Sequence, residues 1–275
     1  MKVYLVAGEP SGDKLGAELM AGLKSCAPYE VDFCGVGGFL MEEQGLTSLF
    51  PISEIAVMGI GEILAKYSFL KKRIKNTVDD ILRLKPDVLI TIDAPEFSLR
   101  VAKMVRKKLF INTIHYVAPT VWAWRPNRAK KISGYVDHIL ALFPFEPPYM
   151  QREGISCDFV GHPVANENLP EPSLVKKFRQ QHKIGENDTL VAFLPGSRIS
   201  EVDRLMPVFK NVSSMLISQK LNTRIVTVVA PAVEHIVVEN LQRWGNNIIV
   251  VTKDDLSSND FQKLKRVVFA SCDIA

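Results

Sequence analysis

Hydrophobic residues along this chain follow two alternating patterns. Short continuous apolar runs, such as the one at residues 88–92, are typical of strands buried on both faces of a parallel sheet. Between them lie segments with apolar residues three and four positions apart, which predict amphipathic helices. We expect strands at residues 2–7, 31–35, 88–93, 110–116, 138–142, 190–194, 224–230, 248–251 and 267–270. We expect helices at residues 13–24, 62–84, 99–107, 127–133, 173–182, 201–218, 233–243 and 261–265. This alternation predicts an α/β fold with right-handed crossovers.

A polar, proline-rich stretch at residues 163–172 interrupts the alternation and has the composition of a linker. It predicts two α/β domains, 1–168 and 169–275. The second is short and has only four expected strands, whereas a doubly wound domain usually has about five or six. The chain also ends directly after an expected strand, with no helix behind it. From the sequence alone we therefore expect the second domain to be incomplete.

The overall composition, with 47% hydrophobic and 23% charged residues, is typical of a soluble globular protein. No apolar run reaches the roughly 18–20 residues needed to span a bilayer, and the first residues resemble a strand rather than a signal peptide. These features predict a cytoplasmic location. The four cysteines lie far apart, without the paired spacing of metal ligands. No metal site and no cofactor are predicted.

Positive charge is concentrated in two places, although the formal net charge is only +4. No carboxylate occurs between Glu96 and Asp137, an interval with nine Lys or Arg residues, and a second basic cluster occupies residues 71–75. These residues either form solvated helix faces or bind an anionic partner such as a phosphate or a membrane surface. Nucleic acid is not an expected partner, because the sequence has no zinc finger, recognition helix or aromatic-rich RNA-binding motif.

Apolar residues crowd the segment 52–70, directly before the second basic cluster. An apolar surface beside a positive one is typical of interfacial attachment to a membrane. The alternative is a helix that packs in the core and is followed by a solvated turn. The candidate membrane patch consists of Val57, Met58, Ile60, Lys71, Lys72 and Arg73.

Two loops at expected strand ends of the first domain carry polar side chains. The segment 7–13, with the sequence AGEPSGD, leads from a strand into a helix whose N-terminus favours anions. Its glycines allow close approach of a ligand, although Asp13 also suits helix capping. Asp93 and Glu96 follow the next buried strand, where open α/β sheets bind ligands. Asp93 is the candidate general base for a hydroxyl group, whereas Glu96 better suits capping of the following helix.

A similar loop lies in the second domain. The sequence LPGSR at residues 194–198 joins an expected strand to a helix. The backbone N–H groups near Gly196 and Ser197, together with the Arg198 guanidinium, are suited to holding a diphosphate. The alternative for Arg198 is a surface ion pair with Glu201. His162, just before the linker, either lines a cleft between the domains or packs in the fold.

Residues 114–128, with the sequence IHYVAPTVWAWRPNR, contain two of the three tryptophans of the chain. Trp buries a large apolar area and its N–H needs a partner, so it is costly to place. Two tryptophans in a proline-punctuated segment predict a shaped loop at a strand end. The alternative is an ordinary strand end with packed aromatic side chains.

Seven segments together resemble one known family. They are residues 7–13 (AGEPSGD), 56–59 (AVMG), 92–97 (IDAPEF), 114–125 (IHYVAPTVWAWR), 143–146 (FPFE), 159–163 (FVGHP) and 194–198 (LPGSR). In this order and spacing they are similar to the lipid-A-disaccharide synthases, which are bacterial inverting glycosyltransferases of the GT-B type, family 19. The resemblance covers the whole chain. It implies two Rossmann-like domains that face a cleft, of which the second is incomplete here.

The resemblance implies an activity in lipid A biosynthesis, the route to the lipopolysaccharide of Gram-negative bacteria. The family joins UDP-2,3-diacylglucosamine to 2,3-diacylglucosamine 1-phosphate and releases the disaccharide 1-phosphate and UDP. By similarity, Asp93 is the base for the acceptor 6-hydroxyl, and Arg198 acts on the UDP diphosphate in a nucleotide site that also includes Gly196, Ser197 and Glu201. The acceptor-cleft residues implied in the same way are Ser11, Asp13, His115, Trp122 and Arg125.

The resemblance further implies catalysis without a metal, peripheral association with the cytoplasmic face of the inner membrane, and a homodimer in a full-length form. Two positions depart from the family pattern, namely Glu96, where aspartate is commoner, and Pro10, where threonine is frequent. Members of the family also continue beyond the length of this chain. Two alternatives therefore stand beside the enzyme, an inactive remnant that only binds lipid and another GT-B enzyme that uses UDP-N-acetylglucosamine.

Overall fold

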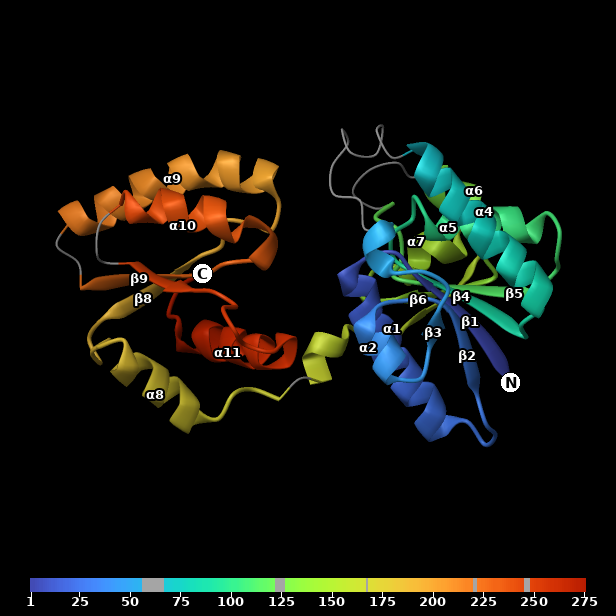
Figure 1. Cartoon of the computed structure of the whole chain (residues 1–275), viewed down its shortest axis with the longest axis horizontal. Helices are drawn as coiled ribbons and strands as arrows, with labels where there is room; N and C mark the ends of the chain where they lie inside the picture. Colours follow the sequence, from blue (N-terminus) through green and yellow to red (C-terminus); the bar gives the residue numbers. More distant parts are fainter. Residues whose placement is uncertain (56–66, 122–126, 167, 220–221, 245–247) are drawn as a thin grey trace. The chain divides into compact units, whose positions relative to one another are not determined.

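A computed structural model describes residues 1–55, 67–121, 127–166, 168–219, 222–244 and 248–275 of the chain (Figure 1). The contacts divide the chain into two compact units, Met1–Glu167 and Asn168–Ala275. This division lies beside the boundary between residues 168 and 169 that the proline-rich stretch predicts. Each unit has its own parallel sheet and its own buried apolar clusters.

The first unit is built on a parallel sheet with the order β3-β2-β1-β4-β5-β6-β7 in its described residues. Strand β1 lies between β2 and β4, and its register places Ala7 beside Ile92. In the next pair, Ile92 of β4 lies beside Tyr116 of β5. The loops that follow β1, β4 and β5 therefore leave the sheet at the same edge. The strands are β1 (Lys2–Ala7), β2 (Asp32–Val36), β3 (Thr47–Ser48), β4 (Val88–Ile92), β5 (Asn112–Tyr116), β6 (His138–Ala141) and β7 (Ser156–Phe159).

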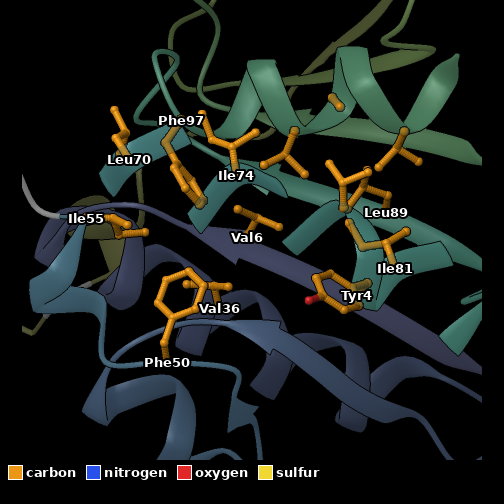
Figure 2. Packing of buried hydrophobic residues seen from close by; sticks show 14 of the residues in the cluster. Tyr4, Val6, Val36, Phe50, Ile55, Leu70, Ile74, Ile81, Leu89 and Phe97 are labelled. Carbon is orange, nitrogen blue, oxygen red and sulfur yellow. The ribbon is translucent and has the colours of Figure 1, made fainter. Parts of the chain in front are cut away.

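Helices cover both faces of this sheet (Figure 1). They are α1 (Pro10–Cys26), α2 (Phe39–Glu43), α4 (Tyr67–Leu84), α5 (Ser98–Arg106), α6 (Asn127–Ile132) and α7 (Pro147–Gln151), with 3₁₀ turns η1 (Ile52–Glu54) and η2 (Pro163–Asn166). Because strand side chains alternate, Tyr4 packs with Ile74 and Ile81 of α4 on one face, as Figure 2 shows. Leu5 packs on the other face with Met20 of α1. Burial on both faces explains why β1 is continuously apolar.

The second unit has the strand order β10-β9-β8, all parallel, in its described residues. Phe178 of α8 and Phe261 of α11 pack in one cluster with Leu190 of β8. Val202 of α9 and Val237 of α10 pack in a separate cluster. The elements are α8 (Pro172–Gln181), β8 (Thr189–Phe193), α9 (Ile199–Ser218), β9 (Thr223–Val228), η3 (Pro231–Val233), α10 (Glu234–Gln242), β10 (Ile248–Val251) and α11 (Ser258–Ser271).

One expected strand is wrong, because residues 267–270 lie within helix α11. Their short apolar run continues the helical spacing set by Phe261 and Leu264, and Val267 and Val268 pack in the same cluster. The helix begins where the Ser257 hydroxyl accepts a hydrogen bond from the Asp260 N–H at 3.1 Å. The second unit therefore has three strands, not four, among the residues that the structure describes.

Candidate functional site

The first candidate site lies at the carboxyl ends of β1 and β4. The loop after β1 passes so close to the loop after β4 that a Cβ atom on Gly8 would lie 2.5 Å from the Cβ of Ala94. A Cβ on Gly12, at the start of α1, would lie 3.4 Å from the Ile92 carbonyl oxygen. Ser11, next to Gly12, is exposed. Close approach of the two loops explains the glycines of the AGEPSGD segment and brings Ser11 to the edge where Asp93 lies.

The loop after β4 holds two consecutive non-glycine residues in the left-handed region, Asp93 with φ +46° and Ala94 with φ +43°. This conformation costs about 1–2 kcal/mol for each such residue and persists only where neighbouring groups hold it. The Asp93 N–H donates to the Tyr116 carbonyl at 3.0 Å, and the buried Ser98 hydroxyl donates to the Asp93 carbonyl. The Asp93 side chain is half-buried, and no described residue donates a hydrogen bond to its carboxylate. A carboxylate in this arrangement is available to take a proton from a bound hydroxyl group.

A third strained residue lies at the same edge of the sheet. Val117, directly after β5, has φ +80°, which is rare for a β-branched residue. Its N–H donates to the Leu140 carbonyl at 3.0 Å, which fixes the start of the tryptophan-containing segment. Backbone strain of this kind gathers at functional sites. Its presence after both β4 and β5 supports a site at this edge.

Glu96 does not cap helix α5, in contrast to the expectation from the sequence. The N-cap position of α5 is Phe97, without a side-chain cap. The exposed Glu96 carboxylate instead pairs with Arg100 at 2.7 Å and with Arg128 of α6 at 3.4 Å. These contacts join the loop after β4 to the beginning of α6. Trp122 and Arg125, two of the expected acceptor residues, lie outside the described residues, between Val121 and α6.

Asp13 caps a helix, but not the one that its position in the sequence suggests. Its buried carboxylate accepts hydrogen bonds from the N–H groups of Gly38 at 2.8 Å, Leu40 at 3.1 Å and Met41 at 3.1 Å. These groups form the N-terminus of α2, about 25 residues away along the chain. A Cβ on Gly38 would lie 2.6 Å from an Asp13 carboxylate oxygen, so the contact also requires glycine there. Asp13 thus holds the loop after β2 against α1.

Replacing Asp13 by alanine is expected to lower the free energy of unfolding by about 2 kcal/mol or more, because two buried N–H groups and a partly buried one lose their acceptor. Urea unfolding followed by circular dichroism measures this loss. Asp79→Ala, on the exposed side of α4, is the matched control and should stay within about 0.5 kcal/mol of the unchanged chain. Equal stability of the two variants would show that the capping contact contributes nothing.

His115 is buried in the sheet and is only 1% exposed. Its Nδ1 lies 2.8 Å from the Thr91 hydroxyl of the neighbouring strand. Burial, assisted by the nearby Arg128, lowers the pKa of His115 to about 4. The imidazole is therefore neutral near pH 7 and joins β4 to β5. In this position it supports the loops of the site from within the core.

The buried His115 predicts a specific pH dependence of stability. As the pH falls through 6.5, the unfolded state takes up a proton on this imidazole, whereas the folded state resists it down to about pH 4. Folding stability is therefore lost over this window, by up to about 3 kcal/mol. In His115→Asn this contribution is absent, so the stability gap between the unchanged chain and the variant should shrink from pH 7 to pH 4. Urea unfolding at several pH values measures the gap, and the exposed His162→Asn is the control. A gap independent of pH would contradict the buried neutral imidazole.

The second candidate site is the loop between β8 and α9. Gly196 has φ +100°, and a Cβ there would lie 2.6 Å from the Glu201 side chain. The Glu201 carboxylate accepts hydrogen bonds from the N–H groups of Ser197 at 2.9 Å and Arg198 at 3.2 Å, and from the Arg198 Nη1 at 3.2 Å. These bonds lower the pKa of Glu201. The ion pair between Arg198 and Glu201 is thus present, and the donors expected to hold a diphosphate are arranged around a carboxylate.

The candidate membrane patch is described only in part, since Val57, Met58 and Ile60 lie outside the described residues. Lys71 and Lys72 are exposed. Arg73 instead turns toward the fold, where its guanidinium lies over the rings of Phe50 and Phe69 at 4.7 and 5.1 Å and pairs with Glu54.

The described part of α4 packs into the core through Leu70, Ile74, Val78 and Ile81. The basic cluster 71–75 lies within this helix and not in a turn. None of the helices in the described ranges is long and apolar enough to cross a membrane. Those ranges also contain no group of three or more His, Cys, Asp or Glu side chains arranged to hold a metal ion.

His162, the residue before the linker, is exposed, and its Nδ1 accepts a hydrogen bond from the Val164 N–H at 3.1 Å.

Among solved structures, the chain is similar to UDP-GlcNAc 2-epimerase from Neisseria meningitidis, with a TM-score of 0.64 and 14% sequence identity over 97% of this chain and 76% of the other. A likeness at this identity concerns the fold alone. It agrees with the two α/β units described above and defines the chain as a protein of the GT-B fold class.

The particular family follows from the sequence comparisons. The model of the lipid-A-disaccharide synthetase family matches residues 3–269, and the chain belongs to this family. It is 46% identical over 275 residues to the lipid-A-disaccharide synthase of Ruegeria pomeroyi, covering all of this chain and 68% of the relative. It is 44% identical over 253 residues to that of Rhodospirillum centenum, covering 92% of this chain and 63% of the relative. The chain thus spans about two thirds of the length of these relatives.

Proposed function

We propose that this chain carries out the glycosyl transfer expected from its family. The donor is UDP-2,3-diacylglucosamine, the acceptor is 2,3-diacylglucosamine 1-phosphate, and the products are the β-1,6-linked disaccharide 1-phosphate and UDP. Because the anomeric centre inverts, a single displacement suffices, and no covalent intermediate with the protein is needed. The observation that supports the proposal most directly is the Asp93 carboxylate, held in a strained turn at the carboxyl end of β4.

In the proposed reaction, the Asp93 carboxylate removes the proton of the acceptor 6-hydroxyl as its oxygen attacks C1 of the donor sugar. The bond between C1 and the diphosphate oxygen breaks at the same time. Ser11 lies in the neighbouring loop and is proposed to contact the acceptor, as are Trp122 and Arg125. Asp13 and His115 are proposed to act through the loops that they hold.

Negative charge develops on the UDP diphosphate as it leaves. The Arg198 guanidinium and the N–H groups of Ser197 and Arg198 are proposed to offset this charge, because they already surround the carboxylate of Glu201. The diphosphate must displace that carboxylate to use the same donors. The role of Gly196 is to allow the close turn, since its φ of +100° strains any residue with a side chain.

We also propose that the protein works at the cytoplasmic face of the inner membrane without spanning it, and that a full-length form assembles as a homodimer. Both substrates carry acyl chains and negative charge. The exposed Lys71 and Lys72, which follow the apolar segment 52–70, suit a surface with these properties.

The decisive experiment uses two forms of the protein. One is the 275-residue chain, and the other is a chimaera in which this chain replaces the matching part of the Ruegeria relative. Each is incubated with both acylated sugars, while UDP release and disaccharide formation are followed by coupled assay and mass spectrometry. Disaccharide from either form supports the proposal.

Two other outcomes would favour the alternatives. Conversion of UDP-N-acetylglucosamine without any disaccharide would indicate a different GT-B enzyme. Absence of disaccharide with both forms, combined with binding to vesicles of anionic phospholipid, would indicate a lipid-binding protein without the activity.

A further inference from the structure

The turn that carries Asp93 depends on a side chain outside the site motifs. Ser98, the first residue of α5, is fully buried, and its hydroxyl donates to the Asp93 carbonyl and to the Ala94 carbonyl, the latter at 3.0 Å. The Ala94 carbonyl also accepts from the N–H groups of Phe97 and Ser98, both at 2.9 Å. For the Asp93 carbonyl, the Ser98 hydroxyl is the donor among the described residues. This hydroxyl therefore satisfies a polar group that the strained turn would otherwise leave without a partner.

The remaining contacts of the turn fix the other atoms of its backbone. The Asp93 N–H is held by the Tyr116 carbonyl at 3.0 Å, on β5. On the opposite side, Gly8 leaves just enough room for the Ala94 side chain, since a Cβ on Gly8 would lie 2.5 Å away. Without the Ser98 hydroxyl, the Tyr116 carbonyl and the contact with Gly8 would be left to hold the left-handed turn. A turn that costs free energy then relaxes toward ordinary backbone angles, and the direction of the Asp93 side chain changes with it.

We propose that Ser98 is a positioning residue for Asp93, because its buried hydroxyl holds the left-handed turn at Asp93 and Ala94 and thereby fixes the direction of the catalytic carboxylate. The inference rests on the proposed role of Asp93 as general base. Ser98 itself touches no substrate. Its removal should act on turnover, because a small misplacement of a base lowers the rate of proton transfer far more than it changes substrate binding.

The test compares variants of whichever form of the protein turns over the acylated sugars. Ser98→Ala is expected to lower kcat by about 10-fold or more, with both KM values within about 2-fold of the parent. Ser98→Thr, which keeps a hydroxyl, should recover most of the rate. Thr77→Val is the matched control, because Thr77 is also fully buried and its hydroxyl donates to the Arg73 carbonyl at 2.9 Å within α4. It should lose comparable stability in urea unfolding and keep its kcat.

A double-mutant cycle separates positioning from a general effect on the fold. In the Asp93→Asn background the base is gone, so adding Ser98→Ala should change the residual rate by less than about 2-fold. An equal loss in both backgrounds would overturn the positioning role, as would a full kcat in Ser98→Ala when Asp93→Asn is impaired. A normal rate in Asp93→Asn would overturn the base assignment itself, and the role of Ser98 with it.

Discussion

Asp93→Asn is expected to lower turnover by roughly 10²–10⁴-fold while leaving the fold intact, because asparagine keeps the shape of the side chain but cannot take a proton. The half-buried carboxylate has no hydrogen-bond donor among the described residues, so the substitution leaves no buried partner unsatisfied. UDP release under saturating concentrations of both acylated sugars measures kcat, and circular dichroism with urea unfolding checks the fold.

The neighbouring carboxylate provides the control for this substitution. Glu96 lies in the same loop, but its carboxylate is exposed and pairs with Arg100 and Arg128. Glu96→Gln should keep turnover within about 3-fold of the parent, because ion pairs at this exposure contribute little. If Glu96→Gln loses activity and Asp93→Asn does not, the base is Glu96, and the assignment made from the strained turn is wrong.

Arg198→Ala is expected to lower kcat by about 10²–10³-fold, because the departing diphosphate loses a charged donor where its negative charge develops. The same variant also removes the ion pair with Glu201. That pair is half-exposed, with a 3.2 Å contact, so its loss should change stability little. Measurement of kcat together with UDP affinity distinguishes loss of transition-state stabilisation from simple loss of nucleotide binding.

Arg204 is the matched control for Arg198. It lies within the first two turns of α9, the helix that begins directly after Arg198, and is exposed, so Arg204→Ala removes an equal charge nearby in the sequence. Turnover of Arg204→Ala should stay near that of the parent. Similar losses in both variants would mean that any arginine near the start of the helix has this effect, and that Arg198 has no specific role at the diphosphate.

Much of the sheet could be predicted from the sequence, because central strands such as β1 and β4 are buried along most of their length and are largely apolar. The bounds of β1 and β10 match the expected residues 2–7 and 248–251. Strands β3 and β7 are not among the expected strands, since β3 has only two residues and β7, with the sequence SCDF, has no continuous apolar run. The apolar run 267–270 was assigned to a strand because a short buried run has no period of its own. In the structure this run belongs to helix α11, where Val267 and Val268 pack in the same apolar cluster as Phe261.

For the site residues, too, the sequence predicts positions along the chain but not the contacts that each side chain makes. The placement of Asp93 at a strand end follows from the apolar run before it and from the rule that ligands bind at carboxyl ends of parallel strands. The partners of these residues could not be predicted in the same way. Asp13 bonds to Gly38 and its neighbours across a long stretch of chain, and Arg73 turns onto Phe50 instead of presenting its charge to a surface. Nothing in the local sequence specifies such contacts.

The sequence by itself determined the α/β class, the alternation of strands and helices, the order of the motifs and, through them, the family. Local periodicity and a run of motifs suffice for these features because each is encoded within a few residues. Only the tertiary structure decided that Asp93 and Ala94 are left-handed, that Ser98 holds them, and that His115 is buried and neutral. These properties depend on which distant groups meet around a residue, since burial, backbone strain and pKa are set by neighbours in space and not by neighbours in the chain.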